Sequence, residues 1–144
     1  VFPGLTSRRI QIEEPVLVVC GSLNALSREQ ISKLDCPLYQ LGQSVGEDGL
    51  AIVATPLVSG QVANAEAESV ARSVSEMTRG VDVQTLFVIG GDTAGAIIGD
   101  ETLEVLGTVD AGIPISRFRG GLLVTKGGGI GTPDILVRLL GGIS

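Results

Sequence analysis

The chain has 144 residues, of which 44% are hydrophobic and 18% charged, so it is long enough to fold as one domain around its own core. A net charge of −6 and an aromatic content of 3% argue against binding to a nucleic-acid backbone and against stacking on bases. The absence of histidine excludes Ser-His-Asp and Cys-His catalysis and most zinc chemistry. Glycine, with 21 residues, has about twice its usual share, so backbone groups must carry much of any function.

Cysteine usage and the terminal sequence bear on the compartment. Cys20 and Cys36 lie beside apolar segments and form no CxxC motif, so we expect two reduced, buried thiols in a cytoplasmic protein. There is no signal-peptide pattern and no apolar run near the roughly 18 residues of a membrane span, so no membrane partner is expected. The sequence opens at Val1 without Met, and its first stretch, Val1 to Ile10, reads as an entry segment and not as the start of a domain. We therefore expect a fragment of a longer polypeptide, with the missing part before Val1.

The first half of the chain alternates short apolar strands with helices. Pro15 to Cys20 is a short apolar run that contains three β-branched valines, as is typical of a strand covered on both faces. Ser27-x-x-Gln30 matches a capping box and predicts a helix from Ser27 to about Lys33 or Leu34. Further predicted elements are strands over 37–41 and 50–54, a turn over 42–49, and a helix over 62–78 whose apolar residues recur every three or four positions.

The second half continues the pattern. Residues 85–89 predict a strand that leads into a short helix through Ile98, with Asp92 or Thr93 as the N-cap. The remaining predictions are two antiparallel strands over 103–109 and 113–118, a strand over 122–125, and a last helix through about Leu140 opened by Thr132-Pro133-Asp134. Together these predict one α/β domain over 1–144: a layered, mostly parallel sheet with helices on its faces and an antiparallel strand pair near 103–118.

The same junction occurs three times: an apolar strand, then glycine with Ser or Thr, then a helix. The three junctions are Val19 to Ser22, Ile89 to Thr93 and Thr125 to Gly131. Ligands of open α/β sheets bind outside the carboxyl ends of the strands, where helix N-termini present unpaired N–H groups suited to phosphate. We therefore expect these junctions to form a cradle for a polyanion; ordinary tight turns are the alternative.

Two common nucleotide motifs do not fit. Gly90 and Gly95 have the first P-loop spacing, but Ala96-Ile97 follows where Lys-Ser/Thr is required. The segment Lys126 to Gly131 fails GxGxxG because Thr132 stands at the third glycine position. Neither a Walker-type nucleotidase nor an NAD-type Rossmann domain is supported.

Taken in order, the motifs resemble the C-terminal, nucleotide-binding domain of the four-carbon acid-sugar kinase family. The resemblance runs from about Val16 to Leu140. The motifs that carry it are Gly21-Ser22 with Ser27-x-x-Gln30-Ile31, Gly90-Gly-Asp-Thr-Ala94, Gly112-Ile-Pro114 and Lys126-Gly-Gly-Gly-Ile-Gly131.

The resemblance implies ATP-dependent phosphorylation of a four-carbon sugar acid such as threonate, erythronate or a 3-oxo-tetronate, with Mg²⁺. The implied nucleotide contacts fall on Ser22, Gly90, Gly91, Asp92, Thr93, Gly128 and Gly129. Asp92 would orient Mg²⁺ or act only as an N-cap, and Lys126 would pair with a phosphate or be merely an exposed lysine at a strand end. Candidate walls of an adenine slot are Leu23, Leu26, Ile97 and Leu136, and nothing in the sequence selects among them.

The chain also departs from the family pattern. Gly129 and Ile130 stand where relatives often carry Asn or Gly and then Phe, which blurs which glycine contacts the nucleotide. The Ala-Asp-Asp-Leu-Thr-Gly-Ala type motif of the family's N-terminal, sugar-acid domain is not in this sequence. The resemblance therefore implies a fragment that binds ATP or ADP weakly, is inactive alone, and could form a homo-oligomer. The alternatives are a non-catalytic module that binds a phosphorylated metabolite and a structural domain with ordinary glycine turns.

Overall fold

The computed structural model describes residues 12–21, 24–36, 38–40, 50–54, 64–77, 83–110 and 112–140. Within these residues, seven strands form one sheet in the order β2-β3-β1-β4-β7-β6-β5. The predicted α/β class is confirmed. The turn predicted over 42–49 and the outer ends of the predicted elements at 37, 41, 62–63 and 78 lie outside the described residues.

Five strands run parallel, and three of them that lie side by side carry the candidate site. These strands are β1 (Val16–Cys20), β2 (Leu38–Gln40), β3 (Leu50–Ala54), β4 (Thr85–Ile89) and β7 (Gly121–Lys126). Cys20 pairs with Ile89, and Ile89 pairs with Lys126. This register brings the carboxyl ends of β1, β4 and β7 to one edge of the sheet, as the sequence predicted.

The other side of the sheet is antiparallel. β5 (Glu104–Asp110) pairs with β6 (Ile113–Phe118), and β6 pairs with β7, so the predicted strand pair is confirmed. The strand predicted over 122–125 is longer at both ends, because it pairs with β4 on one side and β6 on the other. At the edge of the sheet, β5 carries two register shifts, and Val105 on it is 66% exposed.

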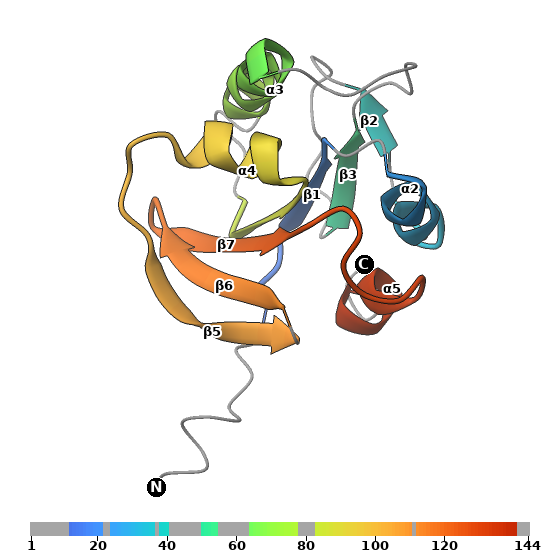
Figure 1. Ribbon diagram of the computed structural model, residues 1–144. Helices are drawn as coiled ribbons and strands as arrows, with labels where there is room; N and C mark the ends of the chain where they lie inside the picture. Colours follow the sequence, from blue (N-terminus) through green and yellow to red (C-terminus); the bar gives the residue numbers. More distant parts are fainter. Residues whose placement is uncertain are drawn as a thin grey trace, which may run out of the picture.

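Within the described residues, four helices cover the two faces of the sheet. α3 (Asn64–Met77) and α4 (Gly91–Ile98) lie on one face, and α2 (Ala25–Ser32) and α5 (Ile135–Leu140) lie on the other (Figure 1). Alternate strand residues feed two cores, because successive side chains of a strand point to opposite faces. Val18, Cys20 and Phe87 pack with residues of α2 and α5. Leu17, Val19 and Val88 pack with residues of α3 and α4.

Two predicted helix starts are wrong, and in both the cap lies further upstream. Asn24 is the N-cap of α2, since its Oδ1 accepts a hydrogen bond from Leu26 N–H at 2.9 Å. The predicted cap residue Ser27 is instead fully buried inside the helix. For α4 the N-cap is Gly90, with φ 115° and no side-chain cap bond, so neither Asp92 nor Thr93 caps it.

Neither cysteine forms a disulfide, but only Cys20 is buried; Cys36 is half-buried, contrary to the expectation of two buried thiols. Among the described helices, none combines the length and the apolar character that crossing a membrane would require.

Candidate functional site at the carboxyl edge of the sheet

Backbone hydrogen bonds tie the three strand ends to one another. Gly21 N–H donates to Ile89 O at 3.0 Å, and Gly90 N–H donates to Lys126 O at 2.9 Å. The turn after β1 therefore begins beside the end of β4, and the turn after β4 begins beside the end of β7. The predicted Gly90–Thr93 turn and the segment after Lys126 are brought together.

The first turn of α4 lies over the end of β1. Gly91 and Asp92 are exposed, whereas Thr93 is 2% exposed and its side chain faces Gly21. A Cβ on Gly21 would lie 1.9 Å from Thr93 Oγ1, so only glycine allows this approach. The start of α4 thus presents backbone N–H groups and the Asp92 carboxylate, while the Thr93 hydroxyl is occupied by packing.

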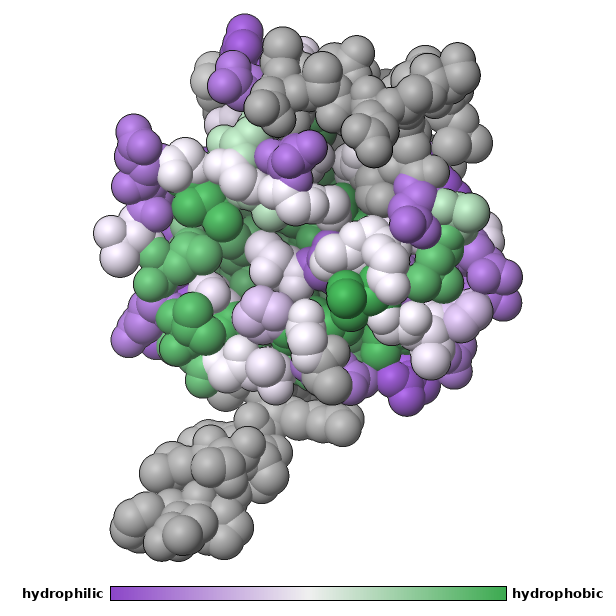
Figure 2. Space-filling model, in the orientation of Figure 1, coloured by the Kyte–Doolittle hydropathy of each residue, from purple (hydrophilic) through white to green (hydrophobic). Residues whose placement is uncertain are grey.

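The second part of the site is the loop between β7 and α5, residues 127–132, which we call the glycine loop. Gly127 and Gly128 are half-buried, and Gly129 is exposed. Ile130 N–H donates to Gly127 O at 3.2 Å, which closes a turn whose central residues are Gly128 and Gly129. Figure 2 shows a surface of near-neutral hydropathy at the centre of the view, where Figure 1 places this loop.

Lys126 is not exposed at the strand end, contrary to one of the two alternatives predicted for it. It is 2% exposed, and its Nζ donates to Gly127 O at 2.6 Å and to Ile130 O at 2.9 Å. Burial lowers the pKa of Lys126 below 10.5, and the charge interaction with Cys20 opposes this. The exposed lysine predicted as one alternative is therefore wrong: the residue is buried, and its amine contacts two carbonyls of the glycine loop.

Two further residues hold this loop, although the sequence motif predicts a different role for them. Ser27 Oγ donates to Gly128 O at 2.7 Å, and Gln30 Nε2 donates to Ile130 O at 3.1 Å and to Thr132 O at 2.9 Å. Both side chains are fully buried. The three-residue spacing of Ser27 and Gln30 is typical of a capping box. The same spacing also places both side chains on one face of a helix, and here that face meets the glycine loop.

Of the other predicted site residues, Ser22 lies outside the described residues, immediately after Gly21. No group of three or more metal-ligating side chains occurs within the described part of the chain. Asp92 alone still fits Mg²⁺, because this ion is commonly held by one or two carboxylates together with substrate phosphates. The suggested adenine walls Ile97 and Leu136 belong to the two opposite cores, so they cannot line one slot.

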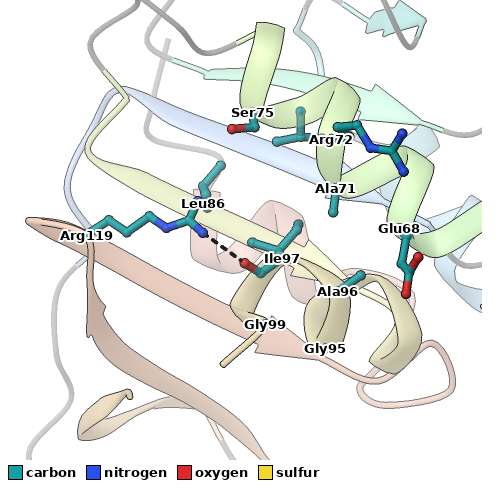
Figure 3. A pocket seen from close by; sticks show the side chains of 11 residues that line it. Glu68, Ala71, Arg72, Ser75, Leu86, Gly95, Ala96, Ile97, Gly99 and Arg119 are labelled. Carbon is teal, nitrogen blue, oxygen red and sulfur yellow. Dashed lines mark hydrogen bonds between the residues drawn. The ribbon is translucent and has the colours of Figure 1, made fainter. Parts of the chain in front are cut away.

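Two hollows lie away from this edge and were not anticipated from the sequence. A cavity of about 540 Å³ lies between α3 and α4, and one of about 170 Å³ lies beside Phe118 and Gly121. Figure 3 shows the larger one, where Arg119 donates a hydrogen bond to Ile97 O at 3.3 Å. Arg119 also pairs with Glu101 and thereby lowers the pKa of that carboxyl. Leu86, near the start of β4, lines both hollows, so they lie toward the opposite end of the sheet.

Comparison with known proteins agrees with this geometry. Residues 43–136 match the family described as "Nucleotide-binding C-terminal domain". The D-threonate kinase of Bordetella bronchiseptica is 29% identical over 89% of this chain, and the chain spans 40% of the length of that relative.

Solved structures share the fold. A domain of unknown function from Bordetella bronchiseptica, a domain-swapped dimer with bound citrate, has a TM-score of 0.73 at 21% identity over 89% of this chain and 40% of its own. A Haemophilus influenzae protein has a TM-score of 0.70 at 14% identity, over 94% of this chain and 42% of its own. The motifs, the site geometry and the family match agree, and the chain belongs to the nucleotide-binding C-terminal domain family of the four-carbon acid-sugar kinases.

Proposed function

We propose that this chain is the ATP-binding part of a kinase that phosphorylates a four-carbon sugar acid of the threonate, erythronate or 3-oxo-tetronate type. The observation that carries the proposal is the meeting of the α4 start and the glycine loop at one sheet edge, joined through the bond from Gly90 N–H to Lys126 O. The D-threonate kinase relative supports the reaction class.

Phosphoryl transfer requires mainly positioning and charge neutralisation, which backbone groups can provide. N–H groups at Gly91–Thr93 and in the glycine loop would hold the phosphates, and the family resemblance assigns a further nucleotide contact to Ser22. Asp92 would hold Mg²⁺, which neutralises phosphate charge when bound. In the reaction, the sugar hydroxyl oxygen bonds to the γ-phosphorus, the bond from this phosphorus to the β–γ bridging oxygen breaks, and the hydroxyl proton passes to a base.

We propose that the sugar-acid pocket and the catalytic base belong to a part of the complete protein that is not in this sequence. The relative is much longer than the matched region, so a sugar-acid domain that also supplies the base is proposed to precede Val1. The domain-swapped dimer of the structural relative supports a homo-oligomer. We propose a cytoplasmic location for the complete protein.

Thermal unfolding with Mg²⁺-ATP tests the proposal. At a ligand concentration about ten times Kd, binding should raise the melting temperature by roughly 5 °C. Gly91→Ala and Gly129→Ala should weaken this shift, because each adds a methyl group where the phosphates would approach the backbone. Both substitutions should fold: a Cβ on Gly91 meets nothing within 4 Å, and one on Gly129 meets only Asn24 Nδ2 at 3.7 Å.

Gly95→Ala is the matched control, since the residue lies in α4 and its Cβ also meets nothing within 4 Å. It should leave the ATP-induced shift unchanged. A chain that ignores ATP and ADP but is stabilised by another phosphate ester would instead be a metabolite-binding module. If none of these ligands stabilises the chain, the remaining interpretation is a structural domain whose glycine turns only connect its strands.

A further inference from the structure

We infer that Ser27, Gln30 and Lys126 act as positioning residues for nucleotide binding, by holding the carbonyl oxygens of the glycine loop so that its N–H groups face the ligand. We call these three side chains the carbonyl clamp. The inference rests on the proposed function, which it deepens by separating the groups that touch phosphate from those that aim them.

The clamp contacts four of the six carbonyls of the loop, those of Gly127, Gly128, Ile130 and Thr132. Lys126 Nζ donates to Gly127 O and Ile130 O, Ser27 Oγ to Gly128 O, and Gln30 Nε2 to Ile130 O and Thr132 O. The donors come from α2 and from the end of β7, about a hundred positions apart in sequence. None of these bonds helps α2 or the β7 ladder to form, so their effect is on the shape of the loop.

Peptide geometry converts these contacts into a direction for the N–H groups. In a trans peptide unit, the carbonyl of one residue and the N–H of the next point in opposite directions. Because the oxygens of Gly127, Gly128 and Ile130 point toward the clamp, the N–H groups of Gly128, Gly129 and Gly131 point away from it. Within the described residues these three N–H groups donate to no protein acceptor.

Three outward N–H groups in a glycine turn suit the oxygens of a phosphate chain. The start of α4 is tied to the start of this loop by the bond from Gly90 N–H to Lys126 O, so the two sets of donors serve one ligand. The clamp side chains themselves are buried: Ser27 and Gln30 are 0% exposed and Lys126 is 2% exposed. They therefore act through the backbone and not by contact with the nucleotide.

Gln30 shows that the clamp is maintained at a cost. Its Oε1 is the one buried side-chain polar atom in the described chain that lacks a hydrogen-bond partner. A buried acceptor without a donor is destabilising. An apolar residue at position 30 would avoid this cost but would lose both hydrogen bonds that Gln30 donates, to Ile130 O and to Thr132 O, so the amide is needed for its two donors.

The test compares Ser27→Ala with a matched control, Thr85→Val, in this chain. Each variant removes one buried hydroxyl that donates to a backbone carbonyl: Ser27 Oγ to Gly128 O at 2.7 Å, and Thr85 Oγ1 to Glu13 O at 2.6 Å. Thr85 begins β4, at the opposite end of the strand from the site. The two changes therefore have similar effects on folding and differ in whether they touch the glycine loop.

Ser27→Ala should weaken Mg²⁺-ATP binding by about 2- to 10-fold, whereas Thr85→Val should leave Kd unchanged even if both lower the melting temperature. Without nucleotide, Ser27→Ala should also shift the NMR signals of the Gly128 and Gly129 amides. Lys126→Met, which removes two of the bonds, should weaken binding by about 10-fold or more.

Each contrary result has a distinct meaning. If wild type binds Mg²⁺-ATP and Ser27→Ala and Lys126→Met bind it equally well, the clamp is overturned and the proposed function stands. If both Ser27→Ala and Thr85→Val weaken binding in proportion to lost stability, the role of Ser27 is structural and the inference fails. If wild type binds no nucleotide, the proposed function fails and the clamp fails with it as a ligand-positioning device.

Discussion

A single glycine at the end of β1 sets how closely α4 approaches the sheet. Any side chain at Gly21 would overlap Thr93, whose Oγ1 would lie 1.9 Å and whose Cβ would lie 2.8 Å from the added Cβ. This contact fixes the start of α4 over the site edge. The glycine is therefore required by packing, independently of any ligand.

Gly21→Ala should destabilise the chain by about 1–3 kcal/mol, because the added methyl must displace Thr93 and the first turn of α4. Gly95→Ala should instead stabilise it by about 0.5–1 kcal/mol, since alanine is favoured inside a helix and its methyl group meets open space. Urea unfolding of both variants measures the difference. Equal effects at the two positions would contradict the packing role of Gly21.

The buried lysine predicts a pH dependence of stability. Burial, the larger influence, lowers the pKa of Lys126 in the folded chain, while the unfolded chain keeps a value near 10.5. Between these values the unfolded state binds more protons than the folded state, so the free energy of unfolding rises with pH. The neutral amine retains enough N–H groups for both loop carbonyls.

The stability of wild type relative to Lys126→Met should therefore increase as pH is raised from neutral toward 10.5. Urea unfolding over a pH series measures this difference, and subtraction of the variant removes the contributions of the other titrating groups. A difference that falls with pH would mean that the ammonium is favoured in the folded state, contrary to this prediction.

At the scale of elements, the start of α2 supports the glycine loop. Asn24 caps the helix that carries Ser27 and Gln30, and its Nδ2 lies 3.7 Å from the position of a Cβ on Gly129. The capped end of the helix therefore lies close to the loop that the helix holds.

Asn24→Ala should cost about 1 kcal/mol of stability through loss of the bond from Leu26 N–H to Asn24 Oδ1. Ser32→Ala, at the other end of the same helix, removes an exposed hydroxyl bond to Glu29 O and should change stability by less than about 0.5 kcal/mol. Chemical denaturation of the two variants compares them. A larger loss for Ser32→Ala would show that α2 is not capped in this way.

The strands were predictable to within a residue or two, because buried parallel strands are apolar throughout and glycine-rich junctions mark their ends. The common edge of β1, β4 and β7 followed from the parallel topology alone. The roles of Ser27, Gln30 and Lys126 did not, because each depends on contacts between segments far apart in sequence. A local motif suggested a capping box, and long-range packing placed the same residues under the loop.

At the scale of the molecule, the site edge and the antiparallel side of the sheet have separate roles. β5 and β6 extend the sheet beside β7, and the exposed Val105 lies on the edge strand. This part supports β7, whose carboxyl end leads into the glycine loop. The apolar side chains that Figure 2 shows on the left of the view lie over this part of the molecule and the end of α4.

The central claim is that the carboxyl ends of β4 and β7 form one phosphate-binding site. An NMR titration of the chain with Mg²⁺-ATP tests it most directly, with every backbone amide as a reporter. We predict that the amides of Gly90–Thr93 and of Gly128, Gly129 and Gly131 shift together and saturate with one common Kd. Shifts confined to the cavity between α3 and α4, around Arg72 and Arg119, would contradict it.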